Sequence, residues 1–575
     1  MAYAILRALF VEPLFDELAT LYWYIQTGYL PGRGATMDAN NHILNSLVSN
    51  QFFLLFGDHF FVYRLFALCT FPIYFFASRK FLLLSASNPF SFLIFLALIS
   101  VHWIFDYFSF SRGYGPSLAF LVLAFCFIRN WLDQRKTSSF IGIVLSFIIA
   151  LLCNLSLFIP LIILLFYLII ISIIQIRQFS RKQLAGIWIT TLCFLSFLIP
   201  VYIYILKLKK AGALWWGSSD GLWEVTGKSI SKNVLFTDNH SLKFISLFLL
   251  FILFFIFMYT WRKTGFVFFL QKTEFWIPAL FGSTLVSFIL LAQFMDLNYP
   301  MDRVGMYLVV LFILTFGLLT EKYPFTKWSL LLLLWFPLSF VFKMNLNTSV
   351  FSPEDRIHKT FYQKIILEVP DSTSISADYV SQASYAYLTR KEKIPHIAVD
   401  YLPEDTLSKG DYHISWIEKL EWPGYSCLLY DPVSGTRLYK RTIPFKTHVI
   451  LDTLIYPKKS KESVIPLVDF DLRRFTNQLI QTSVEGNVQL DKYCLDLNLR
   501  HEIQSRKEQI RRTDNTRFNW YFGRKTAYRF RYPNHRILVL PEDRFLHIRF
   551  YNDDLNKVNL EAIRVKIVVV TEKFK

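Results

Sequence analysis

The sequence predicts a polytopic α-helical membrane protein that carries a soluble C-terminal region of α/β and β-sandwich character. Three observations indicate this class. Hydrophobic residues make up 54% of the 575 positions, the mean hydropathy is +0.36, and the long apolar stretches stop near Met344. Soluble domains rarely carry so much apolar material, so most of the first 345 residues are expected to lie in a membrane.

The apolar stretches define the expected spans. A helix that crosses a bilayer needs roughly 20 mostly apolar residues, because lipid offers no partner to an unpaired backbone group. The stretches that meet this length well are residues 60–78, 157–176, 185–206, 244–260 and 275–295. Shorter or less uniform ones are residues 89–105, 117–128, 140–152, 304–319 and 328–344. Residues 1–15, interrupted by Arg7 and Glu12, are either a short tilted helix or the end of a longer one. The prediction is roughly 11 spans.

Basic residues predict the orientation. Lys and Arg gather in every second connection, whereas the connections between them, such as residues 153–156, are neutral or slightly acidic. Because cytoplasmic loops carry the excess of Lys and Arg, the N-terminus is expected inside and the C-terminal region outside the cell (inner) membrane. Lys207, Lys209 and Lys210 fall on the predicted outer side, against this rule. The net charge of +18 comes with no nucleic-acid-binding motif, so a nucleic-acid partner is not expected.

The predicted domains are residues 1–348, 349–445 and 446–575. A helix over 354–367 and short strand-like runs indicate a small α/β domain; the runs are 373–377, 396–401, 412–416 and 425–430. Runs of β-branched and aromatic residues then favour a β-sandwich; they are 447–455, 536–540, 546–551 and 563–570. The charged segment 498–512 is interpreted as a solvated helix face rather than a binding site.

Polar residues cluster at the predicted outer surface. Asp16 and Glu17 directly follow the first apolar stretch. Adjacent carboxylates at a helix end cannot point the same way, so one suits a general base and the other a metal or substrate ligand. The simpler alternative is two acidic residues at a membrane boundary. Asp38, Asn41 and His42 follow in the same loop; His42 alone fits a hydrogen-bonded loop residue, whereas with the acidic pair it fits a folded cap that carries a site.

Two further clusters lie on the same predicted side. The first comprises His102, Asp106, Arg112 and Tyr114. A guanidinium there suits bidentate binding of a phosphate, with an Asp106–Arg112 ion pair as the structural alternative. The second comprises Asp296, Tyr299, Asp302 and Arg303. Arg303 either neutralises a phosphate or caps its helix in the headgroup layer. The four clusters are scattered in sequence but share one predicted side of the membrane, which makes them candidates for one site.

The order of these motifs resembles the GT-C membrane glycosyltransferases, a superfamily that includes protein O-mannosyltransferases and aminoarabinose transferases. The matching residues are Asp16-Glu17, Asn41-His42, Leu55-Phe56-Gly57-Asp58 with Arg64-Leu65, Ser111-Arg112-Gly113-Tyr114, and Arg303 with Tyr307. The resemblance covers roughly residues 10 to 345. Ile43-Leu44 stands where the family often has Pro-Pro, and Ser109 and Phe110 stand where a second acid is common.

The resemblance implies transfer of a sugar from a polyprenyl-phosphate donor to a glycan, lipid or protein acceptor on the outer side. Asp16 and Glu17 would be catalytic, with Asp16 as general base and Glu17 as candidate ligand of a divalent cation, Mg²⁺ or Mn²⁺. The substrate-binding residues would be Asp38, His42, His102, Asp106, Arg112, Tyr114 and Arg303. The alternatives are a transporter or flippase, or a non-catalytic membrane anchor for a glycan-binding domain. The scarcity of charge inside the spans argues against transport.

Overall fold

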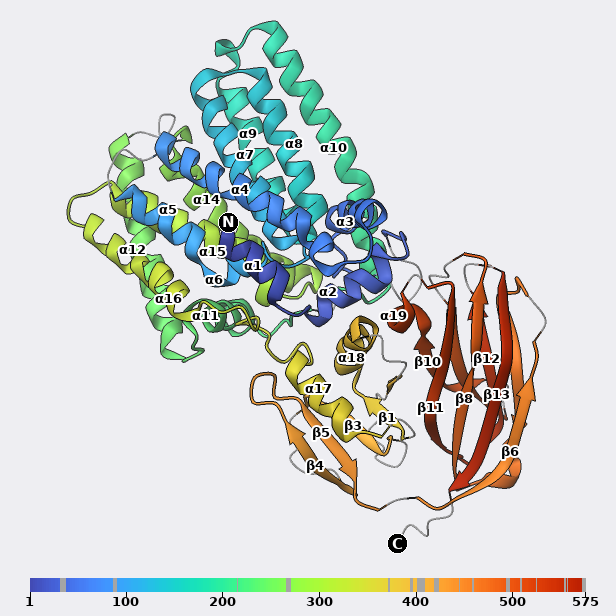
Figure 1. Cartoon of the computed structure of the whole chain (residues 1–575). Helices are drawn as coiled ribbons and strands as arrows, with labels where there is room; N and C mark the ends of the chain where they lie inside the picture. Colours follow the sequence, from blue (N-terminus) through green and yellow to red (C-terminus); the bar gives the residue numbers. More distant parts are fainter. Residues whose placement is uncertain are drawn as a thin grey trace. The chain divides into compact units, whose positions relative to one another are not determined.

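The computed structural model describes most of the chain. The described residues are 1–31, 38–85, 90–214, 216–264, 270–370, 373–392, 397–400, 409–417, 423–443, 445–457, 460–492, 497–506, 509–523, 525–552, 555 and 557–570. They form two compact units. The helical unit comprises Met1–Val11 and Gly28–Phe351, and the C-terminal unit comprises Glu12–Thr27 and Ser352–Lys575. Figure 1 shows helices in the first, and a small mixed sheet beside two stacked sheets in the second.

Among the described residues, seven helical segments are long and apolar enough to cross a membrane. They are α4 (Phe60–Ser85), α7 (Tyr114–Gln134), α9 (Phe158–Ile174) with the 3-10 turn before it, α10 (Arg181–Lys210), α12 (Ser241–Thr264), α14 (Thr273–Met295) and α15 (Met306–Glu321) with the turn η6 (Asp302–Gly305). Shorter helices accompany them: α1 (Ala2–Phe10), α3 (Ile43–Phe56), α5 (Ser91–Ser100), α6 (His102–Asp106), α8 (Thr137–Cys153), α11 (Lys228–Leu235) and α16 (Trp335–Lys343). The predicted helical class is confirmed, and the number of spans stays a prediction.

Two of the less uniform apolar stretches are broken rather than continuous. Val101 has extended dihedral angles (φ −65°, ψ 104°), so residues 89–105 form the two pieces α5 and α6. The stretch 328–344 begins as the 3-10 helix η7 (Lys327–Leu334) and continues as α16. Because an interrupted helix presents unpaired backbone groups, these pieces need neighbouring helices around them. The polar His102 and Asp106 follow the first of these breaks.

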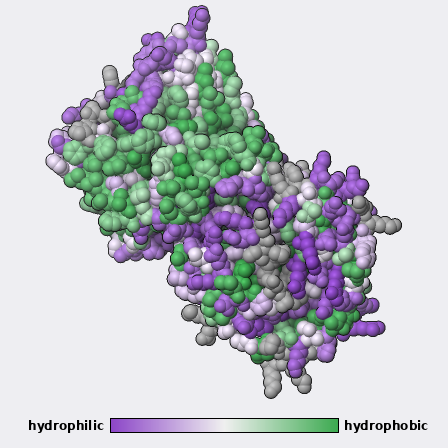
Figure 2. All heavy atoms as spheres, in the orientation of Figure 1, coloured by the Kyte–Doolittle hydropathy of each residue, from purple (hydrophilic) through white to green (hydrophobic). Residues whose placement is uncertain are grey.

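The helices differ sharply in how much of their surface the protein covers. In the most apolar window of α12 only 6% of residues are buried, whereas in Asp302–Glu321 83% are. Phe244, Phe248 and Phe251 on α12 are each more than half exposed. Continuous apolar surface of this kind is unfavourable in water and favourable in lipid. Hydrophobic residues also cover much of this unit in Figure 2. We conclude that the chain is a multi-pass membrane protein.

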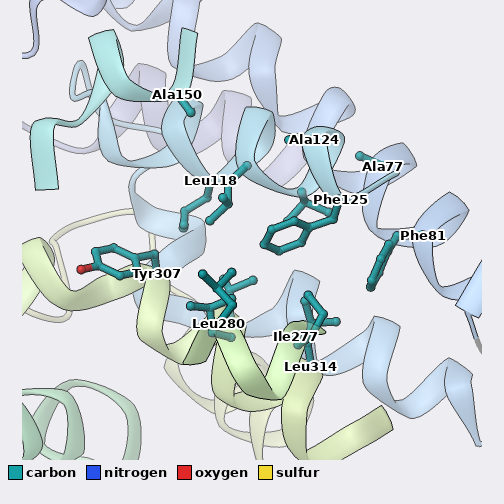
Figure 3. Close-up of a cluster of buried hydrophobic side chains, with 14 of the residues drawn as sticks. Ala77, Phe81, Leu118, Ala124, Phe125, Ala150, Ile277, Leu280, Tyr307 and Leu314 are labelled. Carbon is teal, nitrogen blue, oxygen red and sulfur yellow. The ribbon is translucent and has the colours of Figure 1, made fainter. Parts of the chain in front are cut away.

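The core of the helical unit lies where α4, α7, α8, α14 and α15 meet (Figure 3). The rings of Phe81 and Phe125 lie edge-on to Trp276, with centroid distances of 6.0 and 5.4 Å. Leu118, Ala124, Ile277, Leu280 and Leu314 fill the space around them and are buried. Close packing of this kind gives the shorter helices a rigid frame.

The C-terminal unit begins with a small α/β part. Its five-stranded sheet has the order β2-β1-β3-β5-β4. The strands are β1 (Ile375–Ala377), β2 (Val399–Asp400), β3 (Tyr412–Ser415), β4 (Tyr425–Tyr430) and β5 (Arg437–Arg441). β1 pairs in parallel with β2 and β3, and β5 pairs antiparallel with β3 and β4. Helix α18 (Tyr379–Glu392) connects β1 to β2, and α17 (Lys359–Glu368) precedes them. The predicted α/β character is confirmed.

Two four-stranded antiparallel sheets follow, with orders β10-β9-β12-β7 and β11-β8-β13-β6. The strands are β6 (Thr447–Ile455), β7 (Val464–Asp471), β8 (Leu479–Leu490), β9 (Leu497–Ser505), β10 (Ile510–Arg517), β11 (Ala527–Leu538), β12 (Asp543–Asn552) and β13 (Val558–Val570). The short helix α19 (Phe518–Phe522) lies between β10 and β11. Figure 1 shows the two sheets stacked, which confirms the predicted β-sandwich.

The helix predicted over 498–512 is wrong, since this segment lies in the hairpin of β9 and β10. Leu497, Leu499 and Ile503 lie on one side of β9 and are buried. On the other side, Asn498 and Glu502 are also buried, whereas Arg500 and Gln504 are partly exposed. The apolar residues thus recur with the period of two that is typical of a strand. The density of charged residues concealed the alternation in the sequence.

A buried arginine joins the two parts of the C-terminal unit. Arg536 on β11 donates to Asp411 Oδ1 at 2.5 Å and to the Lys409 carbonyl oxygen at 2.7 Å. Burial raises the pKa of Asp411, but the Arg536 guanidinium and the Ser374 hydroxyl outweigh it and hold that pKa below its usual value. The carboxyl is therefore charged in the folded state and its ion pair supports the junction.

Candidate active site

The turn Ser111–Tyr114 and the loop Asp38–Asn45 meet in the helical unit. Gly113 lies so close to its neighbours that a Cβ there would be 2.0 Å from the Cys153 carbonyl oxygen and 2.7 Å from His42 Cβ. At Gly115 a Cβ would be 2.4 Å from the carbonyl oxygen of Tyr107. The two glycines in Arg112-Gly113-Tyr114-Gly115 are therefore required by close backbone approach. The sequence motif encodes a tight junction between loops that are distant along the chain.

His42 is fixed at this junction by two contacts. Its Nδ1 lies 2.6 Å from the Cys153 carbonyl oxygen, and because a carbonyl only accepts, Nδ1 carries the proton. The imidazole stands edge-on to the Tyr114 ring, with the centroids 4.4 Å apart. In the neutral ring this tautomer leaves the lone pair on Nε2, so His42 has the electronic form of an acceptor at that atom.

Arg112 completes the arrangement, which we call the Arg112 centre: Asp38, Asn40, His42, Arg112 and Tyr114. The guanidinium donates to Asn40 Oδ1 and lies 5.8 Å from the Tyr114 ring centroid. Asp38 accepts a hydrogen bond from the Asn40 backbone nitrogen at 3.0 Å. Arg112 is 1% exposed and Asp38 is half-buried. Asn45 secures the turn by donating to the Ser111 carbonyl oxygen at 3.2 Å. The structure thus brings together four of the predicted site residues and adds Asn40.

Asp106 and His102 belong to a second cluster, the Asp106 centre. Asp106 forms an ion pair with Arg7 at 2.9 Å, and His102 Nδ1 lies 3.4 Å from the same carboxylate. All three side chains are buried. The alternative of an Asp106–Arg112 ion pair is therefore wrong, because Arg7, more distant in sequence, takes that position. Charged residues inside apolar surroundings are stable only when paired in this way.

Further contacts show that the Asp106 centre ties chain segments together. Arg7 donates to the carbonyl oxygens of Asn345 and Thr348, at 2.6 and 3.2 Å. The Tyr3 hydroxyl donates to the Asn345 carbonyl at 3.0 Å and lies 3.5 Å from His102 Nε2. Helix α1 is thereby joined to the residues that follow α16. Sequence reasoning noted Arg7 only as an interruption, although a lone arginine in an apolar stretch is itself a signal of a buried partner.

Arg64, from the Leu55–Leu65 part of the resemblance, also acts within the helical unit. Its guanidinium donates to the carbonyl oxygens of Ala8 and Val11, at 3.0 and 2.8 Å. These carbonyls belong to the C-terminal end of α1, where backbone acceptors are left over. Nearby, Tyr63 donates to Asp58 at 2.5 Å. This motif therefore fixes the end of the first helix.

Asp16 and Glu17 lie on the short helix α2 (Phe15–Thr20), which belongs to the C-terminal unit. Glu17 is fully buried, and its Oε2 accepts a hydrogen bond from the Leu14 backbone nitrogen at 3.3 Å. This is a capping arrangement for the first turn of the helix. Asp16 is half-buried. The two adjacent carboxylates therefore differ, as expected for a pair at a helix end, and Glu17 has a structural task.

Aromatic residues hold α2 and the following π-helical turn η1 (Leu21–Ile25) in the C-terminal unit. Phe15 N donates to the Asp355 carbonyl oxygen at 2.8 Å. The Tyr22 ring stacks on Trp520 with centroids 4.7 Å apart and planes 15° from parallel. Arg517 lies over the rings of Trp23 and Trp520, at 5.8 and 5.4 Å. The position of Asp16 is thus set by residues more than 300 positions away, which no local pattern reveals.

Arg303 lies in a third local cluster of the helical unit. It is half-buried on η6, and its guanidinium is 5.0 Å from the Trp216 ring centroid. Its neighbour Asp302 accepts from the Asn233 side-chain amide at 3.1 Å. Tyr299 N donates to the Ser218 carbonyl oxygen at 3.0 Å, which fixes the loop that carries Trp216. Sequence reasoning missed Trp216, for which the Trp-rich run 215–223 was the available signal.

The predicted divalent cation rests on Glu17. The helix cap engages Oε2 of that carboxylate. Within the described ranges, no three His, Cys, Asp or Glu side chains are grouped so as to hold a metal ion. Hard cations take six or more oxygen ligands, several of them usually carboxylates. A cation at Glu17 therefore stays a prediction.

No model of a known protein family matches the sequence, and no curated protein matches it. Two solved structures are similar to this chain. ArnT from Cupriavidus metallidurans, in the apo state, is 10% identical; the match covers 75% of this chain and 94% of that chain with a TM-score of 0.31. The arabinosyltransferase EmbB from Mycobacterium smegmatis is 12% identical, over 99% of this chain and 63% of that chain, with a TM-score of 0.37. This chain thus spans less than two thirds of the length of EmbB.

The roles of individual residues rest on the geometry of this chain alone.

Proposed function

We propose that this protein is a membrane glycosyltransferase that moves a sugar from a polyprenyl-phosphate carrier to an acceptor on the outer side of the membrane. The observation that carries the proposal is the division of the acidic pair. Glu17 is buried and holds the start of α2, whereas Asp16, the next residue, is half-buried. A general base must reach the hydroxyl whose proton it takes, so Asp16 is the member of the pair that fits this role.

The reaction needs one proton acceptor and one site for a departing phosphate. The acceptor oxygen forms a bond to the anomeric carbon from the side opposite the phosphate, and the bond between that carbon and the phosphate oxygen breaks. The electron pair leaves with the phosphate, and Asp16 takes the proton of the acceptor hydroxyl. The configuration at the anomeric carbon is inverted. The donor must therefore be bound by cationic groups that stabilise the phosphate as its charge grows.

Arg112 and Arg303 are the cations proposed for this task. Arg112 is buried beside Tyr114 and held by Asn40, so its guanidinium is oriented before a ligand arrives. Arg303 is half-buried over Trp216. Guanidinium groups bind phosphate oxygens in a bidentate manner, and low-polarity surroundings strengthen the contact. His42 also contacts the Tyr114 ring. Its Nε2 is proposed to accept a hydrogen bond from a sugar hydroxyl.

The full-length chain in lipid nanodiscs provides the test. We expect transfer from a polyprenyl-phosphate pentose or hexose to be at least a hundredfold slower in Asp16→Asn, because the amide cannot take a proton. Asp238→Asn is the matched control, since Asp238 is an exposed carboxylate outside the candidate clusters, on a connection predicted to face the same side. Equal transfer by Asp16→Asn and the native chain would overturn the assignment of the base.

The same measurement separates the alternatives. A transporter or flippase would move the lipid-linked sugar across the bilayer without changing it chemically. A membrane anchor would show neither transfer nor transport. Absence of transfer from any polyprenyl-phosphate sugar by the intact chain would therefore refute the enzymatic proposal as a whole, whatever the variants do.

A further inference from the structure

The sheet β10-β9-β12-β7 has a second face, opposite to the one that packs in the sandwich. Residues directly opposite each other on antiparallel strands point to the same side. On this side the register pairs Phe545 with Gln504, His547 with Glu502, and Arg549 with Arg500. Asp469 on β7 lies opposite His547. We call these residues the outer face of the sheet. Its residues Arg500, Glu502 and Gln504 lie in the charged segment 498–512.

The side chains of the outer face form one connected network. His547 Nδ1 lies 2.5 Å from Asp469 Oδ1, and its Nε2 lies 2.9 Å from Gln504 Oε1. The Arg549 guanidinium is 3.6 Å from Asp469 and 3.8 Å from Glu502. Such contacts fix the side chains in place before any ligand binds, which lowers the entropic cost of binding. The network spans three neighbouring strands and is therefore rigid.

Glu502 has acceptor capacity that the protein does not use. Its side chain is 4% exposed, and Oε1 accepts from the Tyr551 hydroxyl at 2.6 Å. Among the described residues, Oε2 receives no hydrogen bond, because Arg549 at 3.8 Å is too far for one. Buried carboxylate oxygens in folded proteins are nearly always hydrogen-bonded. Because Oε2 is itself buried, a ligand on the surface does not reach it, and Glu502 serves to hold the side chains of Tyr551 and Arg549.

The charges of the outer face balance, which limits the kind of ligand. Arg500 and Arg549 oppose Asp469 and Glu502. A face that binds phosphate or nucleic acid needs an excess of positive charge, and a face that binds an apolar partner needs continuous apolar surface. A mixture of fixed donors and acceptors suits a neutral ligand with many hydroxyls, since each hydroxyl donates and accepts.

Phe545 adds a flat apolar surface at one end of this network. Its ring is 37% exposed and lies nearly parallel to the His547 ring, with centroids 6.1 Å apart and planes 24° from parallel. Arg473 lies 6.0 Å from its centroid and borders it. A sugar ring has one face of C–H groups and an edge of hydroxyls, so it fits an aromatic ring next to polar side chains.

We propose that the outer face of β7, β9 and β12 binds a neutral oligosaccharide, with Phe545 against a sugar ring and the accessible side chains of Asp469 and Arg549 bonded to its hydroxyls. The proposal rests on the proposed sugar transfer only for the source of the ligand, which is a segment of a glycan acceptor. The outer face performs no chemistry.

Binding is tested with the full-length chain in nanodiscs by isothermal titration calorimetry, using cellohexaose, mannohexaose and arabinohexaose as probes. We expect at least one of them to bind with a dissociation constant on the order of 0.1 mM. Phe545→Ala and Asp469→Asn are each expected to weaken that binding about tenfold or more. Asp469 is 56% exposed, so its amide variant keeps the fold. Tyr456→Ala, at another exposed ring of the C-terminal unit, is the matched control and leaves the affinity unchanged.

Each outcome decides for or against the outer face. Lack of binding by all three probes overturns the proposal, and so does binding that neither Phe545→Ala nor Asp469→Asn weakens. Inorganic phosphate that competes with the bound oligosaccharide would instead show an anion site. Transfer without oligosaccharide binding refutes this inference and leaves the proposed function intact. Binding without transfer refutes the proposed function and supports this inference. Asp16→Asn should bind the oligosaccharide as the native chain does.

Discussion

Arg7 and Arg112 are both completely buried in the helical unit, but their guanidinium groups are held in different ways. Arg7 forms an ion pair with Asp106 and donates to two backbone carbonyls. Arg112 donates to the neutral amide of Asn40 and lies beside the ring of Tyr114. In the first arrangement the charge is neutralised in an ion pair that joins distant parts of the chain. The second holds the guanidinium against a neutral amide and an aromatic ring. Burial alone therefore does not reveal what a charge is for.

The largest expected effect comes from breaking the Arg7–Asp106 ion pair. Asp106→Ala leaves the Arg7 charge buried, so we expect about 3–5 kcal/mol of lost stability. The double variant Arg7→Met, Asp106→Leu removes both charges and should recover most of that loss. Chemical unfolding in detergent measures the difference. A loss below about 1 kcal/mol in the single variant would show that the pair is not a structural tie.

Arg112→Lys is expected to act on transfer rather than on folding. Lysine keeps the positive charge but cannot bind two phosphate oxygens in a planar, bidentate way. We expect transfer to fall about a hundredfold, which corresponds to roughly 2.7 kcal/mol in the activation barrier, with a melting temperature within a few degrees of the native value. Initial rates at saturating donor provide the measurement. A rate equal to that of the native chain would make Arg112 a structural residue like Arg7.

Gly113→Ala tests the close approach that forms the Arg112 centre. Its Cβ would meet the Cys153 carbonyl oxygen at 2.0 Å, so the backbone must shift at a cost of about 1–3 kcal/mol. Gly282→Ala is the control, because nothing lies within 4 Å of that Cβ position; in the middle of α14 it should stabilise the helix by up to about 1 kcal/mol. Thermal unfolding compares them. Similar effects of the two variants would contradict the packing described at Gly113.

The smallest effect is expected for Tyr3→Phe. The Tyr3 hydroxyl donates to the Asn345 carbonyl oxygen at 3.0 Å and accepts from Asn345 N at 2.9 Å. Its loss should cost about 1 kcal/mol of stability, since Arg7 still holds the same carbonyl. Transfer per folded molecule should not change. If transfer changed while stability did not, the Asp106 centre would take part in the reaction. The two centres would then not differ in the way proposed.

Local patterns in the sequence were sufficient for the fold class and for part of the site. Continuous apolar stretches predict lipid-facing helices because backbone groups need internal partners in lipid. Alternating β-branched and aromatic runs likewise predicted strands such as β6 and β13. The motif Arg112-Gly113-Tyr114 and the pair Asn41-His42 are recognisable as candidates in the sequence alone. These features depend on residues only a few positions apart, so they can be recognised in the sequence.

Tertiary structure alone decided which charges meet. Arg112 is only six positions from Asp106 in the sequence, yet Asp106 pairs with Arg7 on α1. The segment that carries Asp16 folds with Tyr379 and Trp520, far along the chain. Within residues 498–512, the strands β9 and β10 pair with each other, and β9 also pairs with β12. In each case the stabilising free energy comes from pairing a buried charge or from removing an apolar surface from water. That energy depends on neighbours in space, which no sequence pattern specifies.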